Sequence, residues 1–534
     1  MIDTEVARTF DRRSALFLTG GAVLTSLLIL RMLQMQVFEY KEYSRKSENN
    51  SFRIQTTMAK RGNILSKSGS VISYDEQIYR IYLIPEEIND LDFVIKTVSK
   101  DLKLRKKSIE RIWKNIKKQR SFQPVLITEN TDWNTLAKIV AKNIPGIHID
   151  TGFSRVYKMG PAGAQIFGYV GVPKRNKNNT TPFFTTGITG MENKFDDILS
   201  GTQGQNVMIT NAIGRITGED KSQFIPSVPG KNIKTTIRDD IQKVLYDALA
   251  INRSGAGVVL DIENGEIIAM ASVPSFNPNN FKTDDGDEYI TSLLKDEAKP
   301  FMNKTIEGLY PPGSTFKIIV ALAALESGAI TPNEKIFCPG HWELGNHKYH
   351  CWQKDGHGWV DLEHALKYSC DVYFYQVALR IGIDSIKNMA LKMGLNQKYI
   401  DDVLSHENIG ILPDKYWKEK NIGQSWVRGD TVISGIGQGY ILTNCLQLAI
   451  MIARTVSNKE VVPHLIYTDK KPSFKKLDIR EKNIKSILKG LEQVTKKGGT
   501  AATSAINING KKWVEKQEHL RFVTFQSKNV KQVF

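Results

Sequence analysis

The segment around residue 314 constrains this chain more than any other. Ser-Thr-Phe-Lys at residues 314–317 follows Tyr-Pro-Pro-Gly at 310–313 and precedes an apolar run at 318–325. A Pro-Gly turn that opens a helix places Ser314 near the helix N-terminus, with Lys317 one turn further along the same face. A lysine buried against a serine hydroxyl can act as a base, and the helix dipole favours negative charge at that end. The segment therefore predicts a buried helix that presents a serine nucleophile.

Length and charge narrow the class of protein. The chain has 534 residues, enough for about three domains, and 41% of them are hydrophobic, so a sizeable core can form. The net charge is +17, but no long run of like charge occurs, which argues against a nucleic-acid-binding arm. An anionic membrane or polymer nearby fits this charge better. The four cysteines are too few for a disulfide scaffold.

Residues 14–30 contain no charged side chain and are mostly apolar. Three arginines precede them, Arg31 follows, and the apolar character continues to residue 38. This pattern predicts a transmembrane anchor at 14–38 with a cytoplasmic tail at 1–13. A cleaved signal peptide is the alternative, but no small-x-small cleavage site follows the run. We therefore expect everything after residue 40 to lie outside the cytoplasm.

The next part of the chain mixes short strands with charged helices. Residues 60–72 are typical of a strand, a turn and a second strand, and residues 96–120 of a strongly basic pair of helices. Residues 187–199 form a glycine loop that enters a helix. The loop lacks a following Gly-Lys-Ser/Thr, so it is not a phosphate-binding loop.

A new unit begins near residue 231. A strand end and a capped helix are expected at 235–242. Two apolar runs, at 257–262 and 266–272, flank an Asn-Gly pair, which is a strong β-hairpin signal. Because this hairpin precedes the helix of Ser314, the sequence predicts an α+β domain with an antiparallel sheet.

Together these segments resemble the class B penicillin-binding proteins, and most of all their elongation-specific subfamily, penicillin-binding protein 2. The resemblance runs from residue 1 to about 512 and rests on residues 61–64, 187–199, 264–265, 311–317 and 435–439. It implies an N-terminal anchor, an elongated pedestal or dimerisation domain at 40–225, and a penicillin-binding transpeptidase domain at 231–512.

The resemblance also assigns roles to residues. Ser314 would attack the D-Ala-D-Ala bond of a peptidoglycan stem peptide, with Lys317 as base and the backbone N–H of Ser314 as one oxyanion donor. The second family motif, Ser-x-Asn, is matched by Ser369-Cys370-Asp371, where aspartate replaces asparagine. Ser369 would relay a proton to the leaving D-alanine, and Asp371 beside Lys317 would favour the charged ammonium.

The implied protein is a D,D-transpeptidase of cell elongation in the bacterial inner membrane, with most of its chain in the periplasm. β-Lactams would acylate it, and a SEDS-family glycan polymerase and other elongation-complex proteins would be its partners. An alternative is a catalytically impaired, truncated chain that acts at most as a membrane-anchored scaffold. A β-lactamase-type sensor is disfavoured by the large pedestal domain.

A possible metal site surrounds the second motif. Three cysteines and a histidine form a typical structural zinc set: Cys338, Cys351, His357 and Cys370. Three further histidines lie nearby as alternative ligands: His341, His347 and His350. A Cys338–Cys351 disulfide or unrelated thiols also remain open. Because Cys370 lies between Ser369 and Asp371, a zinc ion would fix the second motif in place.

The third family motif, Lys-Thr/Ser-Gly on a strand, is absent. Lys-Gly-Gly-Thr at 497–500 follows a helix, and no strand pattern leads into it. After Lys512 the chain no longer resembles the family. Trp513 must be encoded by TGG, and codons read one base earlier from that point permit Gly-Gly-Lys-Thr-Gly-Thr-Ser-Gln-Val. We therefore interpret residues 513–534 as an aberrant tail that arises from a frameshift.

This interpretation has a structural consequence. In the family, the strands after the third motif complete the sheet begun by the hairpin at 257–272. Without them we expect an unpaired edge and an uncovered apolar face on that hairpin, a poorly folded catalytic half and weak or absent activity.

Overall fold

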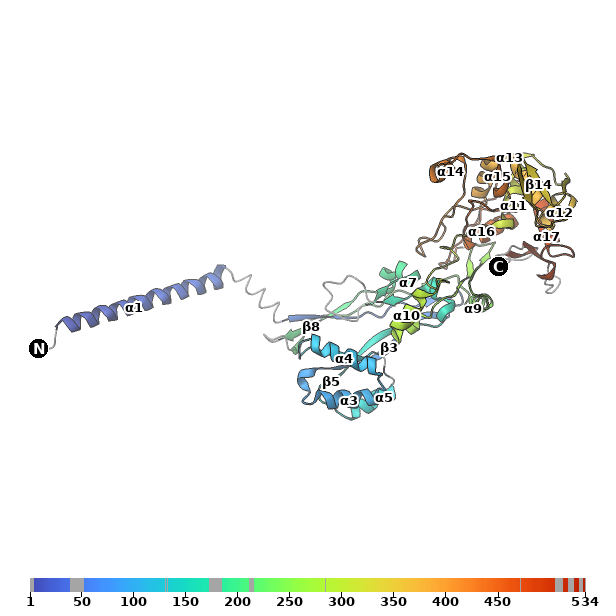
Figure 1. Ribbon diagram of the computed structural model, residues 1–534. Coiled ribbons are helices and arrows are strands. Elements are labelled where there is room, and N and C mark those ends of the chain that lie inside the picture. The colour runs from blue at the N-terminus through green and yellow to red at the C-terminus, as the bar shows by residue number, and fades with distance from the viewer. Residues whose placement is uncertain are drawn as a thin grey trace.

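The computed structural model describes residues 4–38, 52–129, 131, 133–171, 185–210, 216–283, 285–470, 472–504, 512–516, 523–527 and 532–533. The molecule is elongated (Figure 1). A long helix projects at one end, two sheets and a small helical lobe follow, and a helix-rich half that contains Ser314 lies at the other end (Figure 1).

The projecting helix is α1, Thr4–Leu33, which continues into a π-helical turn at Gln34–Phe38. Its stretch Ser14–Val37 is apolar, and none of it is buried against the rest of the protein. A stretch of 24 residues exceeds the roughly 20 needed to cross a bilayer. The helix is therefore suited to a single membrane span, as the sequence predicts.

The part after the anchor contains two sheets. The three-stranded sheet has the order β1 (Phe52–Thr57), β8 (Gly204–Thr210), β9 (Ile216–Ile225). The five-stranded sheet contains β10 (Ile233–Lys234), β2 (Ile64–Leu65), β3 (Val71–Leu83) and β4 (Val125–Thr128) in that order, with β5 (Ile147–Tyr157) also paired to β3. The turn between β2 and β3 confirms the strand-turn-strand prediction at 60–72.

A helical lobe packs on this five-stranded sheet. It consists of α3 (Leu91–Asp101), α4 (Lys106–Lys118) and α5 (Trp133–Ala141). Its own apolar core includes Ile81, Val98 and Ile112. The basic helix pair is therefore confirmed, with Val98 and Ile112 buried on the inner faces of α3 and α4 and most of their lysines exposed.

The glycine loop near residue 187 has a structural role. Short elements surround it: β6 (Val170–Gly171), β7 (Thr186–Gly187), α6 (Ala164–Phe167), α7 (Gly190–Lys194) and α8 (Asp196–Leu199). A Cβ on Gly187 would lie 1.8 Å from the carbonyl oxygen of Glu192, so only glycine permits this approach. The buried carboxylate of Glu192 pairs with Arg61 at 2.6 Å and with Arg155 at 2.7 Å. The loop thus fixes a buried ion-pair network that joins β5 to the segment before β2.

The half that contains Ser314 is built on a sheet of order β12-β11-β19-β18-β17. Its strands are β11 (Gly255–Asp261), β12 (Ile267–Val273), β17 (Lys512–Lys516), β18 (Val523–Ser527) and β19 (Gln532–Val533). The hairpin prediction is confirmed: β11 and β12 are antiparallel, and Gly265 in the turn has a φ of 76°, which glycine adopts without strain.

Two expectations about this sheet are wrong. The edge of β11 is not unpaired throughout, because Leu260 and Asp261 pair with Val533 and Gln532 of β19. The apolar face is not uncovered either, since every residue of β12 is buried. Helix α9 (Asp239–Ala250) contributes Ile241 and Leu245 against one face, and helices of the main core cover the other. The tail after Lys512 thus supplies strands, because β11 offers it free backbone donors and acceptors.

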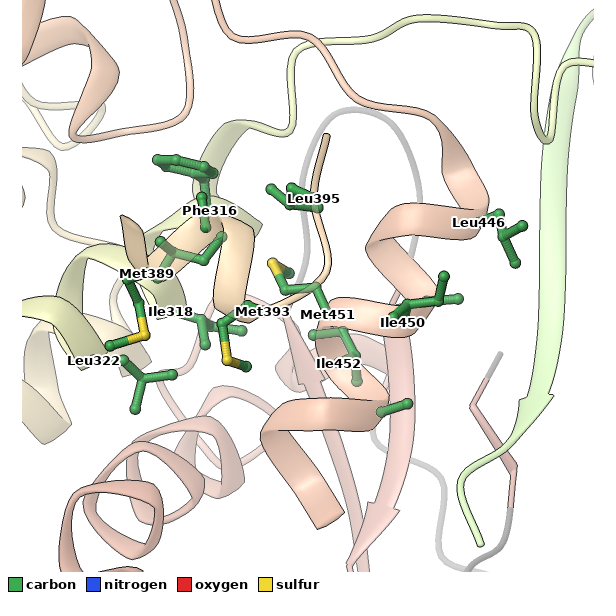
Figure 2. Packing of buried hydrophobic residues seen from close by; sticks show 14 of the residues in the cluster. Phe316, Ile318, Leu322, Met389, Met393, Leu395, Leu446, Ile450, Met451 and Ile452 are labelled. Atoms are coloured by element: carbon green, nitrogen blue, oxygen red, sulfur yellow. The ribbon is translucent and has the colours of Figure 1, made fainter. Parts of the chain in front are cut away.

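The main core lies among the helices of this half. Side chains from α11 (Lys317–Ser327), from the end of α13 (Asp371–Lys392, kinked at Gly382) and from α16 (Cys445–Ser457) point toward one another (Figure 2). Helix α11 is buried from Lys317 through Leu325, so the nucleophile turn is attached to the least exposed helix of this half. The remaining elements are α10 (Gly286–Lys295), β13 (Ile336–Cys338), β14 (His341–Leu344), β15 (His347–His350), β16 (Gly358–Val360), α12 (Leu362–Lys367), α14 (Lys415–Ile422), α15 (Arg428–Ser434) and α17 (Glu481–Val494).

Candidate active site

Ser314 lies in a 3₁₀ turn, Gly313–Phe316, that runs directly into α11. Gly313 has a φ of 54°, and its N–H donates to the carbonyl of Gly437 at 2.9 Å. A Cβ on Gly437 would lie 2.2 Å from the carbonyl oxygen of Gly313. The glycine-rich segment 435–439 therefore acts as a close backbone support for the serine turn.

Four predicted residues meet here, and as whole residues none is more than a tenth exposed: Ser314, Lys317, Ser369 and Asp371. The Lys317 ammonium donates to the Ser369 hydroxyl at 3.1 Å and to the Ser369 carbonyl at 2.9 Å. The Ser369 hydroxyl donates to Ser314 Oγ at 2.7 Å. A continuous hydrogen-bonded path therefore links the lysine to the candidate nucleophile.

The turn between α12 and α13 positions the second motif. Ser369 has a φ of 51°, a left-handed conformation that is uncommon for a residue with a side chain. Such strain occurs mostly at functional sites, where the surrounding structure enforces it. Here the backbone N–H of Ser369 donates to the carbonyl of Leu366, and that of Cys370 donates to the carbonyl of Ala365. Helix α12 therefore holds the turn in this conformation.

Asp371 compensates the buried charge of Lys317. Its Oδ1 lies 2.7 Å from the lysine Nζ, and Lys317 is fully buried. Asp371 is the first residue of α13, where the helix dipole favours a carboxylate. Its second oxygen accepts the backbone N–H of Trp352 at 3.0 Å. Asp371 is thus held by two independent contacts, one from each of its carboxylate oxygens.

Directly behind this motif lies a set of three thiols and one imidazole, here called the thiol–imidazole cluster: Cys338, Cys351, His357 and Cys370. Their potential ligand atoms all lie within 4.8 Å of one another. The three cysteines are free thiols and are buried. His357 Nδ1 lies 3.7 Å from Cys338 Sγ and 3.6 Å from Cys351 Sγ. A tetrahedral zinc ion would set such edges at about 3.6–3.8 Å.

The pKa values of the cluster reflect crowded ionisable groups. Hydrogen bonds from Cys338 and Cys370 hold the pKa of Cys351 far below its ordinary value, while the same kind of contact raises that of Cys370. Burial lowers the pKa of His357, but its contacts to Cys338 and Cys351 outweigh burial and raise it to about 9. The Nε2 atom of His357 is buried, with no hydrogen-bond partner in the described part of the chain. Contacts within the cluster therefore favour a thiolate at Cys351 beside a protonated His357.

The alternative histidines lie outside the cluster. His341 and His350 pair across the β14–β15 ribbon, and His347 begins β15 next to the turn. In the part of the chain that the structure describes, potential ligand atoms gather in the thiol–imidazole cluster, and none of these three histidines belongs to it. Trp352 was not predicted from the sequence: its backbone N–H holds Asp371, and its indole N–H donates to the Tyr368 carbonyl at 2.9 Å. Its position next to Cys351 is the one feature that could have indicated it.

The segment 497–500 is not a third motif in the structure. It forms a turn after α17, as expected, and the N–H of Thr500 donates to the carbonyl of Lys367 at 3.3 Å. Strand β17 occupies the edge of the sheet and packs against α17. It carries Lys512-Trp513-Val514 rather than Lys-Thr-Gly.

Two family models match the chain. The penicillin-binding protein dimerisation domain matches residues 56–235, and the penicillin-binding protein transpeptidase domain matches residues 255–512. Together they cover most of the chain beyond the projecting helix, in the order that the sequence predicts.

Curated and solved relatives agree with these matches. The peptidoglycan D,D-transpeptidase MrdA of Haemophilus influenzae is 31% identical over 86% of this chain and 72% of that protein. MrdA of Escherichia coli K12 is 30% identical over 87% and 75%. Among solved structures, penicillin-binding protein 2 of Helicobacter pylori in complex with MreC superposes with a TM-score of 0.73 at 27% identity, covering 89% of this chain and 91% of that chain.

Proposed function

The chain belongs to the class B penicillin-binding proteins, and we propose that Ser314 is the nucleophile with which it cross-links peptidoglycan stem peptides during cell elongation. It is by family a serine-type peptidoglycan D,D-transpeptidase. The observation that carries the role of Ser314 is the buried path from Lys317 through Ser369 to its hydroxyl.

The reaction is an acyl transfer in two steps. Ser314 Oγ bonds to the carbonyl carbon between two D-alanines, and the bond to the terminal D-alanine nitrogen breaks. The serine proton passes to the base, and a proton is returned to the leaving amine. An amine of a second stem peptide then attacks the ester, loses a proton and releases Ser314. The backbone N–H of Ser314 stands at the start of α11, where it can donate to the oxyanion.

The resting contacts define what each residue must do. Lys317 donates to Ser369, and Ser369 donates to Ser314, so the path is oriented toward the nucleophile oxygen. To accept the serine proton, Lys317 must first be neutral, and Asp371 opposes this by stabilising the ammonium. We assign Lys317 the role of base, Ser369 that of proton relay to the leaving D-alanine, and Asp371 that of an orienting group.

The lack of a third motif on the described strands supports the scaffold alternative. No Lys-Thr-Gly stands on the strand that borders this half of the sheet, so the groups that would hold the substrate carboxylate are missing from the described residues. A chain without them can keep its anchor and pedestal and still bind partners while acylating poorly.

Fluorescent-penicillin labelling separates the two functions. Membranes that contain the full chain should give one labelled band near 60 kDa. Ser314→Ala should abolish the band, while Ser327→Ala, which removes a hydroxyl at the far end of α11, should leave it unchanged. If limited proteolysis shows that the wild-type chain is folded and the chain is still not labelled, the scaffold function is supported and the enzymatic function is overturned.

A zinc ion in the thiol–imidazole cluster is part of the same proposal. The donor set and the 3.6–3.7 Å separations between His357 Nδ1 and two of the sulfurs fit a structural zinc ion held by Cys338, Cys351, His357 and Cys370. Bound there, it would neutralise the thiolates. Because Cys370 lies between Ser369 and Asp371, the ion would restrain the strained turn that carries the relay serine.

The predicted membrane anchor supports the choice of partner proteins. The apolar helix α1 suits an inner-membrane anchor, and we place the bulk of the chain in the periplasm, where stem peptides are found. The Helicobacter pylori relative forms a complex with MreC, so we infer that an MreC-like protein binds this pedestal. A SEDS-family glycan polymerase in the same membrane would supply the strands to be cross-linked. Co-purification of each from membranes tests both partners.

The frameshift interpretation of residues 513–534 stays a prediction. Its support is that the codons for residues 513–522 permit a shifted reading, Gly-Gly-Lys-Thr-Gly-Thr-Ser-Gln-Val, which contains the third motif in its family context. Sequencing the gene decides it: a correct reading frame through the lysine codons, with no alternative motif, would refute it.

A further inference from the structure

A pocket separate from Ser314 lies where β11 begins. It is open to solvent and has a volume of about 590 Å³. One wall comes from Arg253 and Ser254, just before the strand, and the other from the connection 297–310 that leads to the serine turn. None of the four predicted catalytic residues lines it.

The pocket has a surplus of positive charge. Three cations line it, Arg253, Lys299 and Lys304, against the single carboxylate of Glu297. Arg253 and Glu297 lie 3.4 Å apart, but their side chains are 81% and 89% exposed, so water screens the pair. Within the described residues, no carboxylate lies within 4.0 Å of the ammonium of Lys299 or Lys304. Two positive charges are therefore left without a direct counter-charge.

Lys304 is the most informative of these cations. It is 5% exposed, and its Nζ donates to the neutral carbonyl of Lys299 at 3.1 Å. Burial lowers its pKa, and the more distant Asp296 and Glu307 offset this only in part. A buried ammonium is costly unless it is paired with an anion. An anionic group in the pocket would supply the missing partner.

The walls of the pocket are rigid. Ser272 of β12 accepts the N–H of Lys304 and donates to the carbonyl of Met302, both at 3.1 Å. Lys299 has a φ of 52°, and its carbonyl also accepts the N–H of Met302 at 3.1 Å. This strained turn aims the carbonyl of Lys299 at Lys304. A ligand would thus meet a preformed site and would lose little free energy to ordering it.

The remaining lining selects the kind of anion. Met302, Leu309 and Tyr310 add apolar and aromatic surface next to the cations. A bare inorganic ion would leave this surface unused, whereas an organic carboxylate would cover it. We propose that the pocket is a second binding site for a short peptide that carries free carboxylates, and that this peptide is a peptidoglycan stem peptide. The choice of a stem peptide rests on the proposed function.

Thermal unfolding of the full chain in detergent tests the site. Ser314 is first acylated with penicillin and checked by mass spectrometry, so that the catalytic site is closed. The probe is the tripeptide L-alanyl-γ-D-glutamyl-L-lysine, which has carboxylates but no D-Ala-D-Ala bond. We expect its addition to raise the Tm in a saturable way.

Two variants of the pocket and one control make the test specific. Lys304→Met keeps the size of the buried side chain, and Arg253→Gln changes an exposed one, so both should fold. Each should weaken tripeptide binding by about tenfold or more, since a hydrogen bond to a charged group is lost. Lys335→Met, at an exposed lysine outside the pocket, should bind as the wild type does.

Three results would overturn the proposal. They are an equal Tm rise in Lys304→Met, an equal rise with the tripeptide amidated at its carboxylates, and an equal rise with inorganic phosphate at the same concentration. If penicillin fails to acylate the chain, the proposed function fails instead. The same titration is then run on unacylated Ser314→Ala, so the two failures are told apart.

Discussion

The Ser314 site and the thiol–imidazole cluster share the turn at 369–371 but balance their charges differently. In the first, Lys317 is fully buried and has its own carboxylate at 2.7 Å. In the second, three thiols and an imidazole crowd together, and His357 Nε2 has no partner among the described residues. The Ser314 site pairs its buried charge within the chain, whereas the thiol–imidazole cluster has the donor set of a structural zinc site, which we propose a zinc ion completes.

This difference predicts different effects when one residue of each site is removed. Loss of one member of a compensated pair leaves a buried charge, which is costly to both stability and chemistry. Loss of one ligand residue from the thiol–imidazole cluster should instead mainly lower the affinity of the cluster for zinc. The predictions below compare these two kinds of failure.

The largest effect is expected for Lys317→Ala. Removal of a general base slows a reaction by about 10²–10⁴-fold, so the rate of acylation by penicillin should fall by about a thousandfold. The rate is measured by stopped-flow fluorescence with a reporter β-lactam. Lys497→Ala, at the lysine of the false third motif, is the matched control and should acylate at the wild-type rate. A Lys317→Ala rate within tenfold of wild type would remove the lysine from the mechanism.

Asp371→Ala should produce the largest loss of stability. It leaves the Lys317 ammonium buried without its carboxylate, and breaking a buried pair costs about 3–5 kcal/mol. Denaturant unfolding gives the free energy of unfolding directly. Asp371→Asn keeps the acceptor for the Trp352 N–H and restores the residue that the family motif usually has, so it should cost less than the alanine variant. Equal stability of Asp371→Ala and wild type would mean that Lys317 is neutral at rest.

Much of this site was accessible from the sequence, because its signals are local. The spacing of Ser314 and Lys317 and the Asn-Gly hairpin each follow from neighbouring residues, whereas the Ser369-Cys370-Asp371 segment was identified through the resemblance to the family. The structure then brings Ser369 and Lys317 together over 52 positions of chain, and only the resemblance to a family anticipated that contact.

The contacts that sequence reasoning missed are made by backbone atoms. The N–H of Trp352 holds Asp371, and the carbonyl of Gly437 holds Gly313. A backbone group has the same chemistry in every residue, so no residue type marks these positions. The pairing of β19 with β11 was missed for the same reason, because it involves only Leu260 and Asp261 on the hairpin side.

Cys351→Ser should have an intermediate effect. If zinc completes the thiol–imidazole cluster, the purified wild type should contain about one zinc per chain, and the variant should lose most of it. Its Tm should fall, and acylation should slow by less than in Lys317→Ala, because the ion positions the turn and does not react. Cys445→Ser is the control, since that thiol lies in α16 outside the cluster, where burial raises its pKa to about 12. Zinc content equal to background in the wild type would exclude the ion.

The smallest effect is expected for Lys107→Ala on α4. Lys107 pairs with Glu288 at 2.8 Å, nearly the same separation as Lys317 and Asp371, but both side chains are about two-thirds exposed. Water and salt solvate either charge after the other is removed, so no measurable change in unfolding free energy should follow. Lys418→Ala provides the buried counterpart, because Lys418 is 4% exposed and pairs with Asp430 at 2.6 Å. A clear loss of stability in Lys418→Ala and none in Lys107→Ala would show that burial decides the effect of a lost partner. Equal losses in both would mean that burial does not decide the cost of a lost partner, and the large loss expected for Asp371→Ala would lose its basis.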